Sequence, residues 1–229
     1  MTRAAVVVPA GGSGRRMGGV RKQFLELAGE PVLAHALRPF LAHPAVEWVV
    51  VALPESDLAE PPAWLTGLDP RVRLVAGGAE RGDSVRHGLE AVPDEADVVL
   101  VHDAARPLVT VEVIERAINV AARGVGAVVA VPLADTLKEV GDDGRIRGTP
   151  DRSRFWRAQT PQAFPLQMIR DAYRRALADG VQATDDAALV ERYGGEVVVV
   201  EGSPDNLKVT TPVDIVVAEA LLEARNGVA

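Results

Sequence analysis

A loop rich in glycine and positive charge follows the first apolar run of the chain, residues 4–8. The loop reads Pro9-Ala10-Gly11-Gly12-Ser13-Gly14-Arg15-Arg16-Met17 and continues, after a short gap, with Arg21-Lys22-Gln23-Phe24. Glycines let backbone N–H groups close on a ligand without interference from a Cβ atom, and successive N–H groups form a concavity that binds anions. Because four cations share this loop in a chain of net charge −7, the loop predicts a site for a polyanion such as a phosphate chain.

The spacing of this loop does not match two common phosphate-binding motifs. A P-loop requires a lysine directly after its second glycine, where this chain has Val20. The dinucleotide-binding fingerprint requires a third glycine, where this chain has Met17. It also requires an acidic residue about 20 residues further on, and the chain has Pro31-Val32-Leu33 there. A nicotinamide or flavin site, and with it a dehydrogenase, is therefore disfavoured.

Two further polar segments come directly after apolar runs. His102, Asp103 and Arg106 follow Leu100-Val101, and the block Gly77-Gly78-Ala79-Glu80-Arg81-Gly82-Asp83-Ser84 follows another run. The carboxyl ends of parallel strands are where α/β proteins bind ligands. An aspartate there can hold magnesium or bind a hydroxyl, and a helix start favours an anionic partner. The residues alone leave open an Asp–Arg pair that fixes the loop, a simple turn with a cap, and a structural His102.

Short apolar runs that alternate with helical patterns are expected to position these segments. Strands are predicted at residues 4–8, 47–53, 72–75, 98–102, 127–131 and 196–200. Helices are predicted at residues 31–41, 81–92, 110–122 (with Thr110 as N-cap), 165–178, 185–193 and 211–224. The strands are apolar almost throughout, as strands covered on both faces should be. The alternation predicts an α/β fold with a mainly parallel central sheet and helices on both sides.

Residues 133–158 interrupt this alternation. The turn Gly141-Asp142-Asp143-Gly144 is flanked at 136–140 and 145–147 by alternating patterns, which predicts a β-hairpin. A lone hairpin is marginal in water, so it is expected to pack on something, a second subunit being one candidate and a decorated surface loop the alternative. Thr160-Pro161-Gln162 and Thr184-Asp185-Asp186 are typical of helix starts, with Thr184 as an N-cap. Lys208 by itself indicates no more than a solvated lysine.

Composition narrows the class of protein. A chain of 229 residues fits one α/β domain, and its net charge of −7 argues against general affinity for nucleic acid. The absence of cysteine excludes disulfides, thiolate metal sites and cysteine nucleophiles. No stretch approaches the roughly 20 apolar residues of a membrane span, and the first apolar run is too short for a signal peptide. A cytoplasmic protein with no membrane partner is expected.

The loop motif resembles the signature of nucleotidyltransferases that couple a nucleoside triphosphate to a sugar or polyol phosphate, with Arg21 in place of the usual proline. Along nearly the whole chain, the order of motifs is similar to that of one such family, the 2-C-methyl-D-erythritol 4-phosphate cytidylyltransferases of the non-mevalonate isoprenoid pathway. The most specific blocks are His102-Asp103-Ala104-Ala105-Arg106-Pro107 and Gln159-Thr160-Pro161-Gln162. The other matching blocks are the glycine loop, Lys22-Gln23-Phe24, 77–84, Asp135-Thr136-Leu137-Lys138, Asp151-Arg152, Thr184-Asp185-Asp186 and Asn206-Leu207-Lys208-Val209-Thr210.

The resemblance implies a fold and a reaction. The fold is a single Rossmann-like nucleotidyltransferase domain over residues 1–229, with a projecting β-hairpin arm, residues 133–158, that serves dimerisation. In the implied reaction, the 4-phosphate of methylerythritol attacks the α-phosphorus of CTP and diphosphate leaves. The product is 4-diphosphocytidyl-2-C-methyl-D-erythritol, and Mg²⁺ is the implied cofactor. Because the nucleophile is already an anion, no general base is needed, and catalysis rests on positioning and charge neutralisation.

The resemblance also implies roles for particular residues. Four cations match catalytic positions: two, Arg16 and Lys22, stabilise charge on the triphosphate, and two, Arg152 and Lys208, hold the acceptor phosphate. The nucleotide would be bound by Ala10, Gly11, Gly12, Gly14, Gly78, Ala79, Ser84 and Asp103. Asp103 is also the implied metal ligand. The polyol would be bound by Asp103, Arg106, Thr136, Thr160 and Thr184.

The homodimer is implied as the catalytic unit, because the arms of two subunits cross in this family. Thr136 and Arg152 would then reach the partner's site. Two alternatives stay open at this point. A ribitol-5-phosphate cytidylyltransferase has similar motifs and accepts another polyol. A non-catalytic nucleotide sensor would bind CTP without turnover, although the presence of all four matched cations argues against it.

Overall fold

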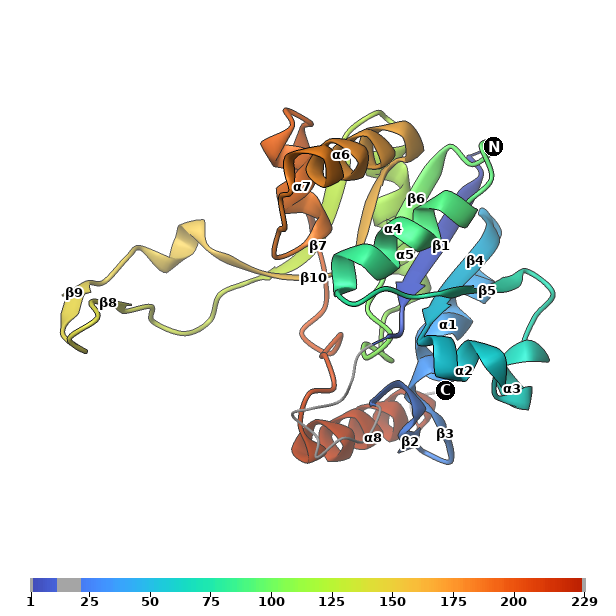
Figure 1. The fold of residues 1–229 in the computed structure, drawn as a ribbon. Helices are drawn as coiled ribbons and strands as arrows, with labels where there is room; N and C mark the ends of the chain where they lie inside the picture. The colour runs from blue at the N-terminus through green and yellow to red at the C-terminus, as the bar shows by residue number, and fades with distance from the viewer. Residues whose placement is uncertain (1, 12–21, 228–229) are drawn as a thin grey trace.

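The computed structural model describes residues 2–11 and 22–227. Seven of the strands described form one sheet in the order β11-β7-β10-β6-β1-β4-β5 (Figure 1). These strands are β1 (Ala4–Pro9), β4 (Val46–Leu53), β5 (Val72–Ala76), β6 (Val98–Val101), β7 (Gly126–Pro132), β10 (Trp156–Pro165) and β11 (Val197–Glu201). Neighbouring strands run parallel except at β10, which is antiparallel to both β6 and β7. The predicted α/β fold with a mainly parallel sheet is confirmed.

Strand β1 shows why the strands are continuous apolar runs. Its residues Ala4, Val6 and Val8 belong to one core cluster, and Ala5 and Val7 belong to a second cluster on the opposite face. Side chains alternate between the faces of a strand, so a strand covered on both faces needs apolar residues at every position. The six predicted strands are confirmed, each to within one residue at either end.

Helices cover both faces of the sheet. The helices predicted from the sequence are all present, and their bounds are α1 (Val32–Ala42), α4 (Arg81–Ala91), α5 (Val111–Ala121), α6 (Leu166–Asp179), α7 (Asp186–Arg192) and α8 (Pro212–Asn226). Helices α1 and α5 pack on one face, and α4, α6 and α7 pack on the other. Helix α8 lies apart from the sheet and packs through Ala218 against Leu27 and Leu108. Short elements complete the chain: η2 (Lys22–Phe24), β2 (Glu26–Leu27), β3 (Glu30–Pro31), α2 (Glu55–Ala59), α3 (Ala63–Thr66) and η3 (Arg152–Arg154).

One predicted helix start is wrong, one predicted N-cap is displaced by a single residue, and one predicted N-cap is confirmed. Thr160-Pro161-Gln162 lies inside strand β10, where pairing with both β6 and β7 buries Thr160 and Gln162. Thr184 is not the N-cap of α7. The next residue, Asp185, takes that place, and its Oδ1 accepts a hydrogen bond of 2.9 Å from the Ala188 amide. Thr110 is the N-cap residue of α5, as predicted.

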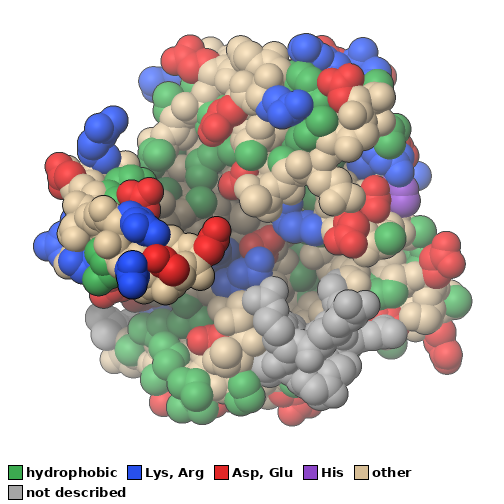
Figure 2. Space-filling model, turned by 60° about the vertical axis from the view of Figure 1, so that its left-hand side comes forward, with side chains coloured by type: hydrophobic (Ala, Val, Ile, Leu, Met, Phe, Trp, Pro, Cys, Tyr) green, Lys and Arg blue, Asp and Glu red, His purple; other side chains and the backbone are tan. Residues whose placement is uncertain are grey.

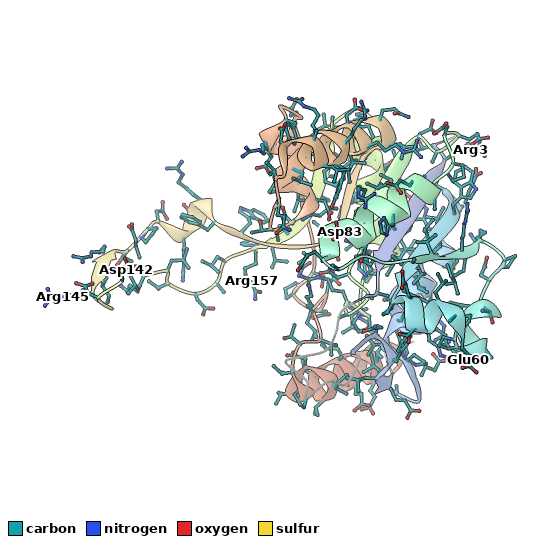
Figure 3. All side chains as sticks on the ribbon, viewed as in Figure 1. Arg3, Glu60, Asp83, Asp142, Arg145 and Arg157 are labelled. Atoms are coloured by element: carbon teal, nitrogen blue, oxygen red, sulfur yellow. The ribbon has the colours of Figure 1, made fainter. Side chains whose placement is uncertain are left out.

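The chain leaves the sheet after β7 and returns to it in β10, and the segment between forms an arm that projects from the body (Figure 1). Near the tip of the arm, β8 (Glu139–Val140) pairs antiparallel with β9 (Ile146–Gly148), which confirms the predicted hairpin. Asp142 and Arg145 lie at this tip, whereas Arg157 lies where the arm joins the body (Figure 3). Four large apolar side chains of the arm are 43–62% exposed: Val140, Ile146, Phe155 and Trp156.

Within residues 2–11 and 22–227, none of the helices combines the length and apolar character that crossing a bilayer requires.

Candidate active site

The loops that follow β1, β5 and β6 meet at the carboxyl edge of the parallel strands. The amide of Ala10 donates to the carbonyl oxygen of Ala52 in β4, and the amide of Gly77 donates to Leu53. A Cβ atom built on Gly11 would lie 3.4 Å from Ser84 Oγ, so the start of the glycine loop borders the loop after β5. The surface of this side of the molecule is hollowed, with both cationic and acidic side chains in the hollow (Figure 2). These contacts bring together residues that the sequence places far apart.

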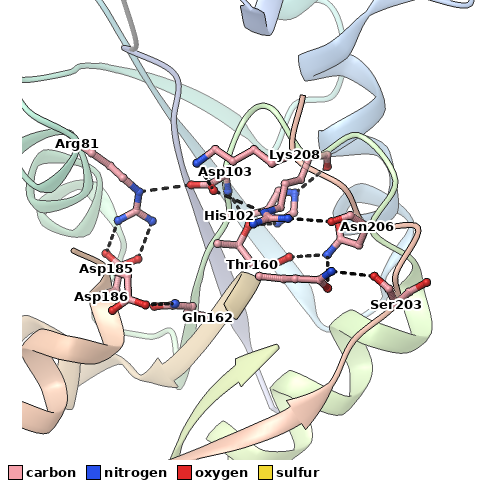
Figure 4. Close-up of polar contacts among 12 residues, drawn as sticks. Arg81, His102, Asp103, Thr160, Gln162, Asp185, Asp186, Ser203, Asn206 and Lys208 are labelled. Atoms are coloured by element: carbon pink, nitrogen blue, oxygen red, sulfur yellow. Dashed lines mark hydrogen bonds and ion pairs between the residues drawn. The ribbon is translucent and has the colours of Figure 1, made fainter. Parts of the chain in front are cut away.

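Asp103, which follows β6, is the centre of a cluster of ion pairs (Figure 4). Its Oδ2 lies 2.7 Å from Lys208 Nζ and 3.6 Å from Arg106 Nε, and its Oδ1 lies 3.3 Å from Arg81 Nε. Burial by itself would raise the pKa of the Asp103 carboxyl, but Lys208 and Arg81 outweigh it and hold that pKa well below its usual range. Three cations therefore surround one ionised carboxylate, an arrangement that suits an anionic ligand.

His102 stabilises the loop that carries Asp103 through hydrogen bonds of its imidazole ring. Its Nε2 lies 3.0 Å from the carbonyl oxygen of Arg106, which can only accept, so Nε2 carries the proton. Nδ1 then accepts from the hydroxyl of Thr160 at 3.1 Å, and the same hydroxyl accepts from the Asp103 amide at 3.0 Å. Complete burial lowers the pKa of His102 to about 4, so the ring is neutral at pH 7. This geometry agrees with the predicted structural role of His102.

Thr160 was predicted to bind the polyol. In the structure its side chain is buried, and both hydrogen bonds of its hydroxyl go to the loop of His102 and Asp103. This arrangement favours a role in positioning Asp103. Direct contact of Thr160 with a polyol stays a prediction.

The segment around Asn206 carries Lys208 to the site. The side-chain amide of Asn206 donates to the carbonyl oxygen of Thr160 at 2.9 Å, and its backbone carbonyl oxygen accepts from Arg106 Nη1 at 2.8 Å. The amide of Val209 donates to the carbonyl oxygen of Ala105 at 2.8 Å. Lys208 lies between these two attachments, which explains why a lysine 105 residues from Asp103 in sequence meets its carboxylate. The interpretation of Lys208 as a merely solvated side chain does not hold.

The loop before α4 is shaped by Ser84. Its hydroxyl accepts from the Gly78 amide at 3.0 Å and donates to the Glu80 carbonyl oxygen at 3.2 Å. The side chains of Glu80 and Asp83 form a reciprocal capping box at the start of the helix. A Cβ atom built on Gly78 would lie 2.2 Å from Asp83 Cβ, so the loop leaves no room for a side chain at that position. The predicted nucleotide-binding residues Gly78, Ala79 and Ser84 thus belong to one compact turn beside Gly11.

The two ends of the glycine loop are tied together. Gln23, a buried residue of η2, donates from Nε2 to the carbonyl oxygen of Ala10 at 2.6 Å. The predictions for Gly12, Gly14 and Arg16, and for the side chain of Lys22, lie outside the described residues. The hydrogen bond from Gln23 therefore holds Ala10, at the start of the loop, next to η2, which begins at Lys22.

Two predicted site residues lie on the arm, away from the cluster of their own chain. Arg152 is in η3, where its Nη1 donates to the carbonyl oxygen of Ala134 at 2.5 Å, and Thr136 lies in the exposed strand-free segment before β8. Both side chains are exposed. Thr184 is exposed too, but it lies beside Asp185 and lines a cavity of 170 Å³ that Arg81 also lines. The fold therefore brings Thr184 towards the site and does not bring Thr136 or Arg152 there.

Sequence reasoning missed several residues of the site. Arg81 was noted only as part of a motif, and no role was predicted for Asp186, Tyr173 or Gln162. Gln162 donates from Nε2 to Asp185 Oδ2 at 2.9 Å and accepts from the Ala187 amide at 2.9 Å, so it ties β10 to α7. The only sequence signal for Asp186 was its place in Thr184-Asp185-Asp186, which equally suits a helix start.

Asp103 offers the chemistry of a metal ligand. Among the described residues, no group of three or more His, Asp or Glu side chains is arranged to hold a metal ion. Mg²⁺ is commonly held by one or two carboxylates together with substrate phosphates and water, so a single aspartate fits such an ion. The phosphates of a bound nucleotide and water would have to supply the remaining ligands.

A mainly parallel sheet, a glycine-rich loop after its first strand and a cationic cluster at its carboxyl edge define this chain as an α/β nucleotidyltransferase. The family model described as 2-C-methyl-D-erythritol 4-phosphate cytidylyltransferase matches residues 4–224. A relative of that name from Symbiobacterium thermophilum is 51% identical over 221 residues, which cover 96% of this chain and 92% of the relative. The chain therefore belongs to the 2-C-methyl-D-erythritol 4-phosphate cytidylyltransferase family.

Solved structures agree with this membership. The structure of 4-diphosphocytidyl-2C-methyl-D-erythritol synthase from Anaerococcus prevotii has a TM-score of 0.87 and 30% identity, covering 97% of this chain and 96% of that one. The structure of 2-C-methyl-D-erythritol 4-phosphate cytidylyltransferase from Thermus thermophilus has a TM-score of 0.81 and 36% identity, covering 96% and 98%. The activity that defines the family is transfer of CMP from CTP to 2-C-methyl-D-erythritol 4-phosphate.

Proposed function

We propose that this chain performs the family's reaction at the cluster around Asp103. An oxygen of the 4-phosphate of methylerythritol forms a bond to the α-phosphorus of CTP, and the bond from that phosphorus to the bridging oxygen of diphosphate breaks. The diphosphate leaves with its electron pair, and no proton has to be removed from the nucleophile. The observation that carries the proposal is the convergence of Lys208, Arg81 and Arg106 on one carboxylate at the edge where the glycine loop begins.

Each part of the site has a role in this proposal. The glycine loop and the turn of Gly78 and Ser84 would hold the triphosphate and the base, because both present backbone groups at close approach. Lys208 would hold the acceptor phosphate, since it is half exposed beside Asp103 and can turn towards an anion. Lys22 and Arg16 would neutralise charge on the triphosphate. Such positioning and charge stabilisation are the main sources of catalysis in phosphoryl transfer.

Asp103 would hold Mg²⁺ and contact the hydroxyls of the ribose and the acceptor. Bound Mg²⁺ would supply charge neutralisation on the triphosphate oxygens. The contribution of the chain is to keep Asp103 ionised and oriented, which Arg81 and the Asp103–Thr160 hydrogen bond support.

The arm, residues 133–158, would join two copies of the chain into a homodimer. Its exposed apolar side chains, Ile146 and Phe155 among them, have no core of their own in the arm and would be covered by a partner. Arg152 and Thr136 lie on the arm and away from the site of their own chain, so they would complete the site of the partner. This proposal accounts for why predicted site residues lie on a projecting hairpin.

A subunit-mixing experiment tests the arm. Arg152→Ala and Lys208→Ala place one defect on the arm and one on the body, and each variant alone should have little activity at an acceptor concentration well below the wild-type KM. In a co-expressed mixture, each mixed dimer has one site with both defects and one intact site, so about a quarter of the wild-type activity should return. No recovery would mean that Arg152 does not act across a subunit boundary.

Ile146→Asp should make the protein monomeric in analytical ultracentrifugation.

The acceptor is tested by diphosphate release with CTP and Mg²⁺, comparing 2-C-methyl-D-erythritol 4-phosphate with ribitol 5-phosphate. Turnover with the first acceptor alone is expected. Lys208→Met should reduce it strongly, and Arg123→Met, which changes an exposed cation after α5, should not. Turnover with ribitol 5-phosphate alone would overturn the proposed identity of the acceptor, and CTP binding without turnover would favour a nucleotide sensor.

The expected cytoplasmic location of the protein stays a prediction.

A further inference from the structure

A second carboxylate lies behind the cluster of Asp103. Asp186, the first residue of α7, is completely buried. Its Oδ1 accepts from the hydroxyl of Tyr173 at 2.6 Å. Two nitrogens of Arg81 also donate to this carboxylate, Nη1 to Oδ1 at 3.1 Å and Nη2 to Oδ2 at 2.7 Å (Figure 4). The pair of Arg81 and Asp186 is thus bidentate, which is the strongest and most directional form of such a contact.

Arg81 bridges two carboxylates. While its two terminal nitrogens bind Asp186, its Nε lies 3.3 Å from Asp103 Oδ1. Burial by itself would lower the pKa of the guanidinium, but Asp186 and Asp103 outweigh it and raise that pKa, so Arg81 remains charged. A guanidinium is planar and rigid, so holding its terminal nitrogens in place also determines the direction of Nε.

The two oxygens of Asp103 face different surroundings. Oδ1 faces Arg81, whose position is locked by a fully buried carboxylate. Oδ2 accepts its hydrogen bond from Lys208, whose side chain is 44% exposed, and it lies 3.6 Å from Arg106 Nε, which is beyond hydrogen-bonding distance. One oxygen is therefore held from inside the protein, and the other is directed towards the open side of the site.

We propose that Arg81, locked by Asp186 and Tyr173, is a positioning residue that holds Asp103 Oδ1 and thereby aims Oδ2 at the bound substrates. This inference rests on the proposed function of Asp103. Arg81 comes from α4, Tyr173 from α6 and Asp186 from α7, so the network also joins three helices. A purely structural tie among these helices is the alternative that the experiment must separate from positioning.

The first test variant is Tyr173→Phe, which removes one donor from Asp186 and leaves the ring. Its matched control is Tyr193→Phe, because the Tyr193 hydroxyl donates to a different carboxylate, Asp179, at 2.9 Å near the surface. We expect kcat to fall about tenfold in Tyr173→Phe, as for loss of a hydrogen bond to a charged group, with the KM for CTP within about twofold of wild type. Tyr193→Phe should leave both constants unchanged.

The second variant is Arg81→Lys, which keeps the charge but cannot bind Asp186 through two nitrogens and Asp103 through a third. It should lose more of kcat than Tyr173→Phe does, while CTP still binds in calorimetry. Wild-type kcat in both variants, or a lowered urea midpoint without loss of kcat, would overturn the inference and leave a structural tie. If the wild-type protein itself shows no turnover, the proposed function has failed, and this outcome is distinct because the inference concerns variants of an active enzyme.

Discussion

The hydroxyl of Thr160 offers a direct test of how the site is built. Thr160→Val keeps the shape of the side chain and replaces the hydroxyl with a methyl group. Two buried hydrogen bonds disappear, from the Asp103 amide at 3.0 Å and to His102 Nδ1 at 3.1 Å. Both former partners are then left unsatisfied in the interior, and each such group costs about 1–3 kcal/mol. The free energy of unfolding should therefore fall by about 2–6 kcal/mol.

The variant should also reduce activity, because the amide that it releases belongs to Asp103. Chemical denaturation followed by circular dichroism gives the stability, and diphosphate release gives kcat and KM. The control is Thr66→Val, since the exposed Thr66 hydroxyl donates only to Ala63 in its own helical turn. This control should change stability by less than about 0.5 kcal/mol.

The opposite result would refute this reasoning. If Thr160→Val unfolds like the wild-type protein and only the KM for the polyol phosphate rises, the hydroxyl binds substrate and does not hold the loop. Such a result would support the prediction made from the sequence over the role that the structure favours.

Three further predictions concern the nucleotide turn, the buried histidine and the arm. Gly78→Ala should abolish detectable CTP binding in calorimetry, because the new Cβ would lie 2.2 Å from Asp83 Cβ. Gly82→Ala should bind CTP normally, because a Cβ there meets no described atom within 4 Å. Equal affinity in the two variants would contradict the close approach at Gly78. Stability should decline as the pH falls from about 6.5 to 4, because the unfolded state binds a proton that buried His102, with its pKa lowered to about 4, does not bind. The loss of stability should reach about 3 kcal/mol at pH 4 and should be smaller in His102→Asn. An unchanged slope of stability against pH in that variant would show that other groups cause the decline. Arg152→Ala should raise the KM for the polyol phosphate about tenfold or more and leave the KM for CTP unchanged, and steady-state assays that show the reverse would remove Arg152 from the acceptor site.

Strand β10 shows where local sequence patterns fail. It contains Pro161 and two glutamines, and its first residues are exposed, so no apolar run marks it as a strand. Its second half is buried because β10 pairs with β6 on one side and β7 on the other, and because Ala163 and Phe164 lie in the core clusters on the two faces of the sheet. The side-chain amides of Gln159 and Gln162 are tolerated inside because each donates to a partner brought by another segment, Ser203 and Asp185.

The N-cap of α7 shows a finer limit. Thr184 and Asp185 are both good cap residues and stand next to each other, so the sequence allows either. The tertiary structure decides in favour of Asp185, whose two oxygens bind the Ala188 amide and the Gln162 side chain at once. The choice follows from a contact with β10 that no local pattern contains.

The sequence by itself determined six of the strands, the main helices and the arm, because each depends on residues close together in the chain, and the order of its motifs determined the family. Apolar runs mark strands that are covered on both faces, and the turn at 141–144 marks the tip of the hairpin. The partners of Asp103 could not be predicted from residues close together in the chain. Arg81 and Lys208 lie 22 and 105 residues away, and Asp186 lies 105 residues from Arg81. Only the tertiary structure could decide these contacts, since the order of strands in the sheet, and not spacing along the chain, determines which charges meet.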